Sequence, residues 1–202
     1  MTRTLPLMAA PLFALVAAAP AAASLADVQA HLNSVSSMTA GFTQTDRSGK
    51  IVSGTLSLKR PGKIRFEYQK NVPLLIVGDG KALTFIDYSV RQVQRWPIGN
   101  TPLAVLLNPN RDLARIAKIL PSTRPGVILV EARDPRHPEY GVITLAFTRE
   151  ASAPAGLMLE GWTALDSQNN RTTIRLKNQR FNVDISDKTF SWRDPRPKGP
   201  RN

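Results

Sequence analysis

The sequence predicts a mainly β fold of the α+β kind, an unclosed antiparallel β-barrel with short helices as a lid over an apolar cavity. Polar and apolar residues alternate with a period of two along most of the chain, and turn signals interrupt them at even intervals. This pattern is typical of antiparallel strands that form a curled sheet. Three short segments instead place apolar residues at helical spacing. Their apolar stripes need cover, and the simplest arrangement lays them over the concave face of the sheet.

Residues 1–23 are expected to form a secretory signal peptide. Arg3 supplies a weakly positive start, Leu5 to Val16 an apolar core too short to span a membrane, and Ala21 to Ala23 a cleavage site. The chain contains no cysteine, which excludes disulfides, thiolate metal sites and the lipid-modified cysteine of a bacterial lipoprotein. We therefore expect a mature protein that begins near Ser24, is exported to the periplasm and has no lipid anchor of its own.

The 202-residue chain is long enough for one domain with a substantial core, which we place at residues 24–192. Residues 193–202 are basic and rich in proline, and we expect a disordered tail. The formal net charge of +12 is distributed without a basic block. It fits simple solubility, or docking on an anionic membrane face or an acidic partner. No nucleic acid is expected as a partner, because no aromatic–basic recognition motif is present.

The first half of the domain is predicted to be one helix followed by hairpins. Residues 24–33 form the helix, because Leu25, Val28, Leu32 and Val35 recur at helical spacing. Alternation and turn residues then predict a series of strands. These strands begin near Met38 and continue at 51–58 and 64–68 around Pro61-Gly62, at 74–77 and 83–87 around Asp79-Gly80, and at 90–96.

The alternation stops in the middle of the chain and returns near Gly126. One short helix is expected to start with Thr101 as its N-cap and Pro102 as its first residue. A second helix is expected over 113–120, where Leu113, Ile116, Ala117 and Leu120 recur at helical spacing. Period-two alternation predicts strands at 127–132, 142–148, 157–165 and 172–180, and a final short strand at 189–192, which brings the total to about ten.

The stretch from Ile51 to Tyr68 organises the rest of the fold. Its apolar side chains fall on one face of two successive strands, and Arg60 places a guanidinium at the edge of that face. Spacing alone allows two interpretations of Arg60. It is either a solvated cation at a strand end, or a donor that reaches backbone carbonyls of whatever covers the apolar face.

Enzyme chemistry is not indicated by the sequence. His31 and His137 lack the spacing of a metal site, and no G-x-S-x-G motif occurs. Glu67 and Glu160 are most simply outward-facing strand residues, although a catalytic carboxylate pair stays open. We therefore expect no enzyme, no metal and no cofactor.

A series of short motifs follows along the mature chain, each unspecific by itself. In order, they are Val35-Ser36-Ser37, Phe42-Thr43-Gln44, Gly54 to Gly62 with Leu56, Leu58, Lys59, Arg60 and Pro61, Arg65-Phe66-Glu67-Tyr68, Gly78-Asp79-Gly80-Lys81 with Leu83, and Gly99-Asn100-Thr101-Pro102. Together with the signal peptide and the lack of cysteine, they make the chain resemble the periplasmic outer-membrane lipoprotein carriers, the LolA family. Phe66 departs from well-studied members, which have tryptophan there, and the late strands match less well.

The resemblance implies an unclosed barrel of about eleven strands and a monomeric carrier. Such a carrier accepts triacylated lipoproteins from an inner-membrane ABC lipoprotein-releasing transporter. It delivers them to an outer-membrane receptor or to the outer membrane itself. The resemblance also places the family's latch arginine on Arg60, with partners at Leu32 in the first helix and at Leu106 and Leu107 in the second.

The expected cavity for acyl chains is lined by apolar residues of the sheet and lid, and ordinary core is the alternative for each of them. They are Phe42, Leu56, Leu58, Ile64, Phe66 and Val105, with Leu32 and Leu106 beside them. Two other functions stay open. One is a carrier on the same fold for another lipid, such as a glycolipid, since acyl chains look alike. The other is a periplasmic sensor that binds lipid or exposed protein termini to report envelope stress.

Overall fold

The computed structural model describes residues 24–108, 110–166 and 168–197 of the chain. The expected signal peptide lies outside the described residues, as does the second half of the expected tail. Within the described part, no helix is long and apolar enough to cross a membrane.

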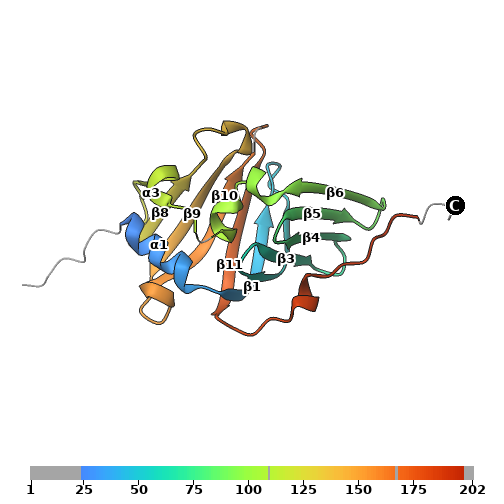
Figure 1. The fold of residues 1–202 in the computed structure, drawn as a ribbon, viewed down its shortest axis with the longest axis horizontal. Coiled ribbons are helices and arrows are strands. Elements are labelled where there is room, and N and C mark those ends of the chain that lie inside the picture. Colours follow the sequence, from blue (N-terminus) through green and yellow to red (C-terminus); the bar gives the residue numbers. More distant parts are fainter. Residues whose placement is uncertain (1–23, 109, 167, 198–202) are drawn as a thin grey trace, which may run out of the picture.

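Eleven strands form one antiparallel sheet in the order β6-β5-β4-β3-β2-β1-β11-β10-β9-β8-β7 (Figure 1). The two ends of this order, β6 and β7, each pair with a single neighbour, so the barrel is unclosed as the sequence predicts. The strands are β1 (Ser37–Thr45), β2 (Ile51–Lys59), β3 (Lys63–Tyr68), β4 (Leu74–Asp79), β5 (Ala82–Asp87), β6 (Gln92–Pro97), β7 (Ala117–Leu120), β8 (Val127–Ala132), β9 (Val142–Arg149), β10 (Leu157–Leu165) and β11 (Arg171–Phe181).

The period of two in the sequence determines which side chains face inward. The β1–β2 pair stays in register from Ser37 opposite Lys59 to Thr45 opposite Ile51. Alternate residues along it, including Phe42 and Leu56, are therefore buried on the same face of the sheet. Threonines and serines occupy the other face.

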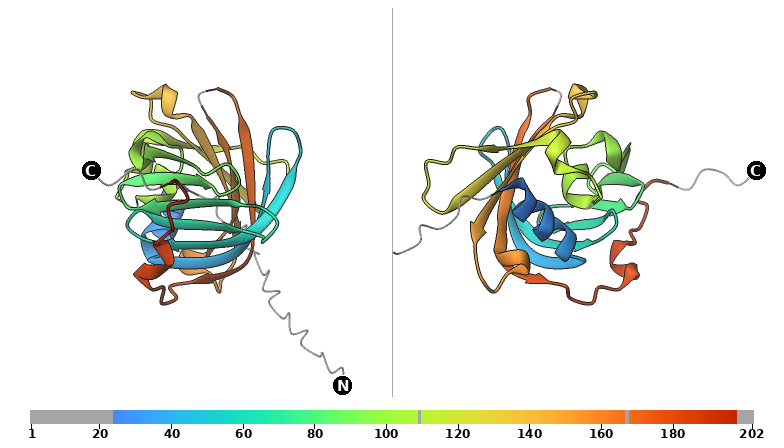
Figure 2. Two further views of the ribbon diagram at one scale, coloured as in Figure 1. Left: turned by 90° about the vertical axis from the view of Figure 1, so that its right-hand side faces the viewer. Right: turned by 60° about the vertical axis from the view of Figure 1, so that its left-hand side comes forward.

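Three α-helices lie on the inner side of the curled sheet, where they cover its apolar face (Figure 2). The first begins with a capping box, in which the Ser24 hydroxyl accepts from Asp27 N and the Asp27 carboxylate accepts from Ser24 N. The helices are α1 (Leu25–Ser34), α2 (Ala104–Leu107) and α3 (Leu113–Ile116), and four 3-10 turns are η1 (Ile98–Asn100), η2 (Pro138–Tyr140), η3 (Pro154–Gly156) and η4 (Asp187–Phe190).

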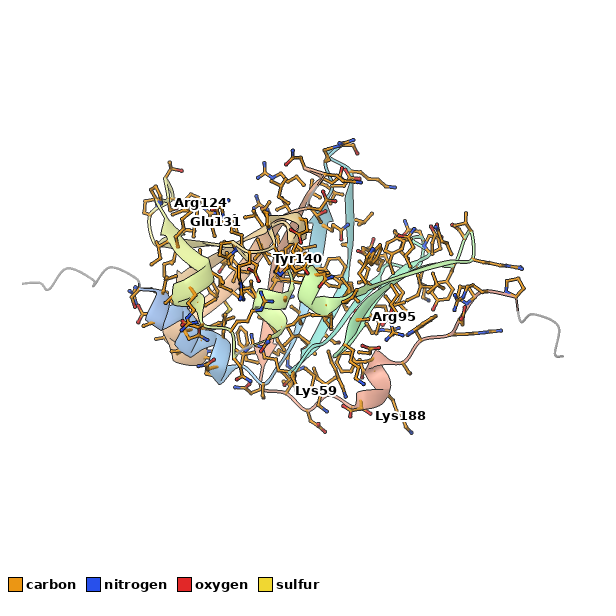
Figure 3. All side chains as sticks on the ribbon, turned by 45° about the horizontal axis from the view of Figure 1, so that its top comes forward. Lys59, Arg95, Arg124, Glu131, Tyr140 and Lys188 are labelled. Atoms are coloured by element: carbon orange, nitrogen blue, oxygen red, sulfur yellow. The ribbon has the colours of Figure 1, made fainter. Side chains whose placement is uncertain are left out.

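The C-terminal segment after β11 crosses to the outer side of the sheet and covers β3 to β5 there. Ile185 and Phe190 pack with Leu75, Val77 and Ile86 in a second, smaller core. Polar contacts hold the segment in place: Lys59 Nζ donates to Ile185 O at 2.9 Å and pairs with Asp187 at 2.8 Å. Figure 3 shows Lys59 beside the turn that carries Lys188.

Three local predictions were wrong. Thr101 does not cap α2: its hydroxyl donates to Ile98 O, and the helix begins at Ala104. The helix expected over 113–120 ends at Ile116, because the next four residues pair with β8 as the edge strand β7. The strand expected over 189–192 is replaced by η4, whose buried Phe190 turns onto the outer face of the sheet.

Candidate functional site

Arg60 follows directly after β2 and extends its guanidinium toward the ends of two helices. Its Nε and Nη2 both donate to Leu106 O in α2, at 3.2 and 3.0 Å, and its Nη1 donates to Val35 O at the end of α1, at 2.8 Å. The fork geometry of guanidinium makes these three bonds from one side chain. Arg60 therefore ties both helices to the edge of the sheet.

The backbone of the same turn adds two more bonds, one to the residue that follows the C-cap of α1 and one to the last residue of α2. Arg60 N donates to Ser36 O at 2.8 Å, and Gly62 N donates to Leu107 O at 3.2 Å. Gly62 has a φ of +72°, and a Cβ there would press on the backbone of Gly80. Only glycine suits this conformation and this close approach.

The electrostatics of the site favour a cation at this position. The last carbonyls of a helix lack intrahelical partners and form the negative end of its dipole. Val35 is the C-cap of α1, and Leu106 lies in the last turn of α2, so both helix ends face Arg60. Burial lowers the pKa of Arg60 to about 10, which leaves the side chain charged at neutral pH.

The lid helices present apolar side chains to the sheet. Val28 and Leu32 of α1, all four residues of α2 and Leu113 of α3 are buried in the main core. The Gln29 side chain also accepts from Leu113 N at 3.1 Å, which joins α1 to the start of α3. The three short helices therefore act as one cover, held by apolar packing and by Arg60.

The interior beneath the lid is apolar and closely packed. The six residues predicted to line a cavity are all at most 4% exposed and belong to one core with the lid residues. In this closed form, helix side chains fill the space that was expected to hold acyl chains. Those six residues are Phe42, Leu56, Leu58, Ile64, Phe66 and Val105.

An aromatic group forms the floor of this interior. The Phe42 ring meets the edges of Phe66 and Tyr68, each at a centroid distance of 5.3 Å, and Phe66 meets Trp162 at 6.2 Å. The Tyr68 hydroxyl donates to Gln44 Oε1 at 2.7 Å, and burial raises the pKa of Tyr68. The Tyr68 hydroxyl, the polar group of this cluster, is thus hydrogen-bonded within the protein, so the cluster offers a ligand an apolar surface.

His31 lies on the buried face of lid helix α1 and was not predicted to have a role. It is 1% exposed, its Nδ1 is 2.9 Å from Pro154 O, and its ring contacts the edges of Phe147 and Phe181. Burial lowers the pKa of His31, and the nearby charge of Arg60 lowers it further. His31 is therefore neutral at neutral pH and fixes α1 to the turn before β10.

Comparison with known proteins identifies the family. The profile described as "Outer membrane lipoprotein carrier protein LolA" matches residues 33–193. The chain belongs to the LolA family. It is 32% identical to an outer-membrane lipoprotein carrier protein of Chromobacterium violaceum, over 95% of this chain and 94% of that one. It is 31% identical to the carrier protein of Sodalis glossinidius, over 94% of both chains.

Among solved structures, a DUF1329 family protein from Desulfovibrio piger shares the fold. It has a TM-score of 0.50 at 11% identity and covers 83% of this chain and 94% of its own. The identity is so low that the likeness concerns architecture alone.

The latch partners that the LolA resemblance implies are only partly the ones that the structure places at Arg60. The Leu106 carbonyl accepts from the guanidinium, but Val35 O takes the place expected for Leu32, one helical turn further along. Leu107 O accepts from the backbone of Gly62 instead of from the side chain. Leu32 and Leu107 serve the lid through apolar burial. The last carbonyls of a helix have no partner within the helix, and this general rule could have indicated Val35 as an acceptor.

Proposed function

We propose that this LolA-family chain carries triacylated lipoproteins through the periplasm by enclosing their acyl chains between the lid helices and the sheet. The observation that supports the proposal most directly is the set of three bonds from Arg60 to Leu106 O and Val35 O, at 2.8–3.2 Å. They join the lid to the edge of the sheet, beside a core of apolar and aromatic side chains. The Arg60 bonds connect the lid to an edge of the sheet and are separate from the hydrogen bonds that pair the strands, so the lid can open without unfolding the sheet.

The energetics of acyl chains explain why a carrier needs such an interior. Each buried CH2 group is worth about 0.8 kcal/mol, so three long chains total on the order of 30 kcal/mol against water. A carrier cannot release that ligand into water. It transfers the chains because its interior is about as apolar as the membrane or protein that donates or receives them, which leaves a small net difference.

Closing and opening of the lid supply the small free-energy difference that sets the direction of transfer. Closing it buries the apolar residues of α1 and α2 and forms the Arg60 bonds, each worth roughly 1.5–3 kcal/mol as bonds to a charged donor. Opening it loses these contacts, and acyl chains replace the lost packing against Phe42, Leu56 and Phe66. Cargo is therefore held strongly enough for transport and weakly enough for delivery.

In this scheme an inner-membrane ABC lipoprotein-releasing transporter supplies the cargo. The monomeric carrier crosses the periplasm and gives the cargo to an outer-membrane receptor or to the membrane itself. The names of the relatives support a carrier of outer-membrane lipoproteins, and the expected signal peptide supports export to the periplasm. The sequence and fold are consistent with a binding protein, so no catalytic step is part of the proposal.

Native mass spectrometry of the mature protein, purified from its own periplasm without detergent, tests the proposal. The expected result is a one-to-one complex with a triacylated lipoprotein. A complex with a free lipid would show that the chain carries another lipid, and an empty protein would reopen the sensor and enzyme hypotheses. The matched comparison is the same protein after delipidation, which should regain mass only when offered a triacylated lipopeptide.

A further inference from the structure

The outer face of β11 carries a row of cations that the lid and the interior do not use. Arg171, Arg175 and Lys177 are exposed and alternate with Ile174 and Leu176, which are buried on the inner side. Beyond an irregularity in the pairing, Arg180 is exposed opposite Thr39. We call these four residues, Arg171, Arg175, Lys177 and Arg180, the β11 stripe.

The residues around the β11 stripe have small, mostly polar side chains, so the longer arginine and lysine side chains extend beyond them. Thr173 pairs with Thr163 on β10 and with Thr45 on β1, and Thr163 pairs with Thr144 on β9. One row further along the strands, Arg175 lies opposite Gly161 on β10 and Thr43 on β1. The stem of Lys177 lies over Gly41, with Cε and Cγ about 3.1 Å from where a Cβ would be.

A groove of about 490 Å³ opens beside the stripe on this face. Arg171, Arg175 and Arg124 line it, together with small residues that include Ala146, Gly161 and three threonines. Glu160 also lines it, but its carboxylate accepts from the Thr148 hydroxyl at 2.8 Å. The groove thus combines three guanidinium groups with hydroxyl donors and one carboxylate.

The cations of the stripe are not occupied by ion pairs within the described part of the chain. Salt bridges there engage other cations, such as Lys59 on β2 and Lys63 and Arg65 on β3, and those of Lys59 and Lys63 are with Asp187 of the C-terminal segment. That segment packs on β4 and β5 and leaves the outer face of β11 uncovered. An uncompensated row of cations costs repulsion and contributes nothing to the core, which suggests a partner.

We propose that the β11 stripe is a docking surface for an acidic segment of a partner protein. Guanidinium groups pair bidentately with carboxylates, and the threonine hydroxyls offer further donors to the same groups. The groove accommodates individual side chains, which favours a polypeptide over a flat bilayer. Ile174 and Leu176 point into the core that includes the lid helices, so the alternating residues of the stripe point away from it, and a partner docked there leaves the lid free to move.

The proposal goes beyond lipid carriage and does not depend on it, because binding is measured on the protein without cargo. The probe is a fluorescein-labelled peptide of alternating glutamate and serine, as long as β11, followed by fluorescence anisotropy. The test variant is Arg171→Gln/Arg175→Gln/Lys177→Gln. The matched control, Lys81→Gln/Arg133→Gln/Lys188→Gln, removes the same charge from exposed residues elsewhere, and Lys188 lies far from Arg124 in Figure 3.

Wild-type protein should bind the peptide, and the stripe variant should bind it at least ~10-fold more weakly, while the control changes by less than ~2-fold. Raising the salt concentration from ~50 to ~300 mM should weaken wild-type binding strongly and the stripe variant little. Equal losses in both variants, or no binding by wild type, would overturn the proposal. So would binding to vesicles containing about 30% phosphatidylglycerol without binding to the peptide, because the surface would then be a membrane site. Thermal melting confirms that both variants fold.

Discussion

The guanidinium of Arg60 donates two hydrogen bonds to the single carbonyl oxygen of Leu106, 3.2 Å from Nε and 3.0 Å from Nη2. Leu106 is buried at 1% exposure in the last turn of α2, so one residue fills the interior with its side chain and accepts both Arg60 bonds with its backbone. Because backbone carbonyls accept these bonds, substitutions at Leu106 change the packing and keep the acceptor. Substitutions at Arg60 remove these bonds and keep the apolar packing of the lid helices.

We therefore expect Arg60→Leu to leave the sheet folded and to shift the lid toward an open, lipid-loaded state. The variant should bind lipoprotein but transfer it to outer-membrane vesicles at least ~10-fold more slowly, since the loss of bonds worth roughly 1.5–3 kcal/mol each removes the drive to close. Arg95→Leu is the control, because Arg95 also loses an ion pair, with the exposed carboxylate of Asp79. Transfer by Arg60→Leu at the wild-type rate would contradict the latch.

Lowering the pH should destabilise the closed form through His31. Its folded-state pKa is lowered by burial, so below its ordinary value of 6.5 the unfolded chain binds a proton that the folded protein does not. Stability from this residue is thus complete above pH 6.5 and is lost as the pH falls toward the lowered value. Urea unfolding at a series of pH values measures it.

The matched variants are His31→Gln and His137→Gln. His31→Gln should flatten the dependence below pH 6.5, and His137→Gln, at an exposed turn, should leave it unchanged. An unchanged profile in His31→Gln would assign the pH effect to other groups.

Because β2 packs closely against β3 and the Phe42 ring, replacing Gly54 by alanine should affect stability differently from replacing Gly99. A Cβ at Gly54 would lie against the Glu67 carbonyl and 2.9 Å from Phe42 Cε1, while a Cβ at Gly99 would meet nothing within 4 Å. Gly54→Ala should lower the free energy of unfolding by about 1–3 kcal/mol, as expected for overpacking. Gly99→Ala should have little effect, and a similar loss in both variants would argue against the β2–β3 packing described above.

The C-terminal segment should contribute to stability through Phe190. This ring is 7% exposed in the second core with Leu75, Val77 and Ile86, so Phe190→Ala should cost about 3–5 kcal/mol and make the segment sensitive to proteases. Lys188→Ala, on the same turn but exposed, is the control. Unfolding curves and limited proteolysis check both, and a stable, protease-resistant Phe190→Ala would contradict the second core.

Much of the sheet could be predicted from the sequence because its strands have one buried and one exposed face. The strand expected over 157–165 matches β10 residue for residue, and that over 127–132 matches β8. The pattern is a direct consequence of burial on one side, so it survives in the sequence without knowledge of the pairing.

The predictions failed where tertiary contacts override local pattern. Leu113, Ile116, Ala117 and Leu120 have helical spacing, yet pairing with β8 converts the second half of this stretch into strand β7. The latch position at Arg60 followed from a motif, but its acceptor at Val35 depends on where α1 ends. The burial of His31 depends on the distant turn at Pro154, and no local spacing contains that information.

The distance between the lid and the sheet tests the latch most directly. Because the chain lacks cysteine, spin labels can be attached at two exposed positions, Ala30→Cys on α1 and Lys70→Cys in the β3–β4 turn. Double electron–electron resonance then measures the distance between the two labels. We predict one narrow distribution without ligand, a longer distance with a triacylated lipopeptide, and that longer distance without ligand when Arg60→Leu is added. A single distribution unchanged by the lipopeptide and by Arg60→Leu would contradict a lid latched by Arg60.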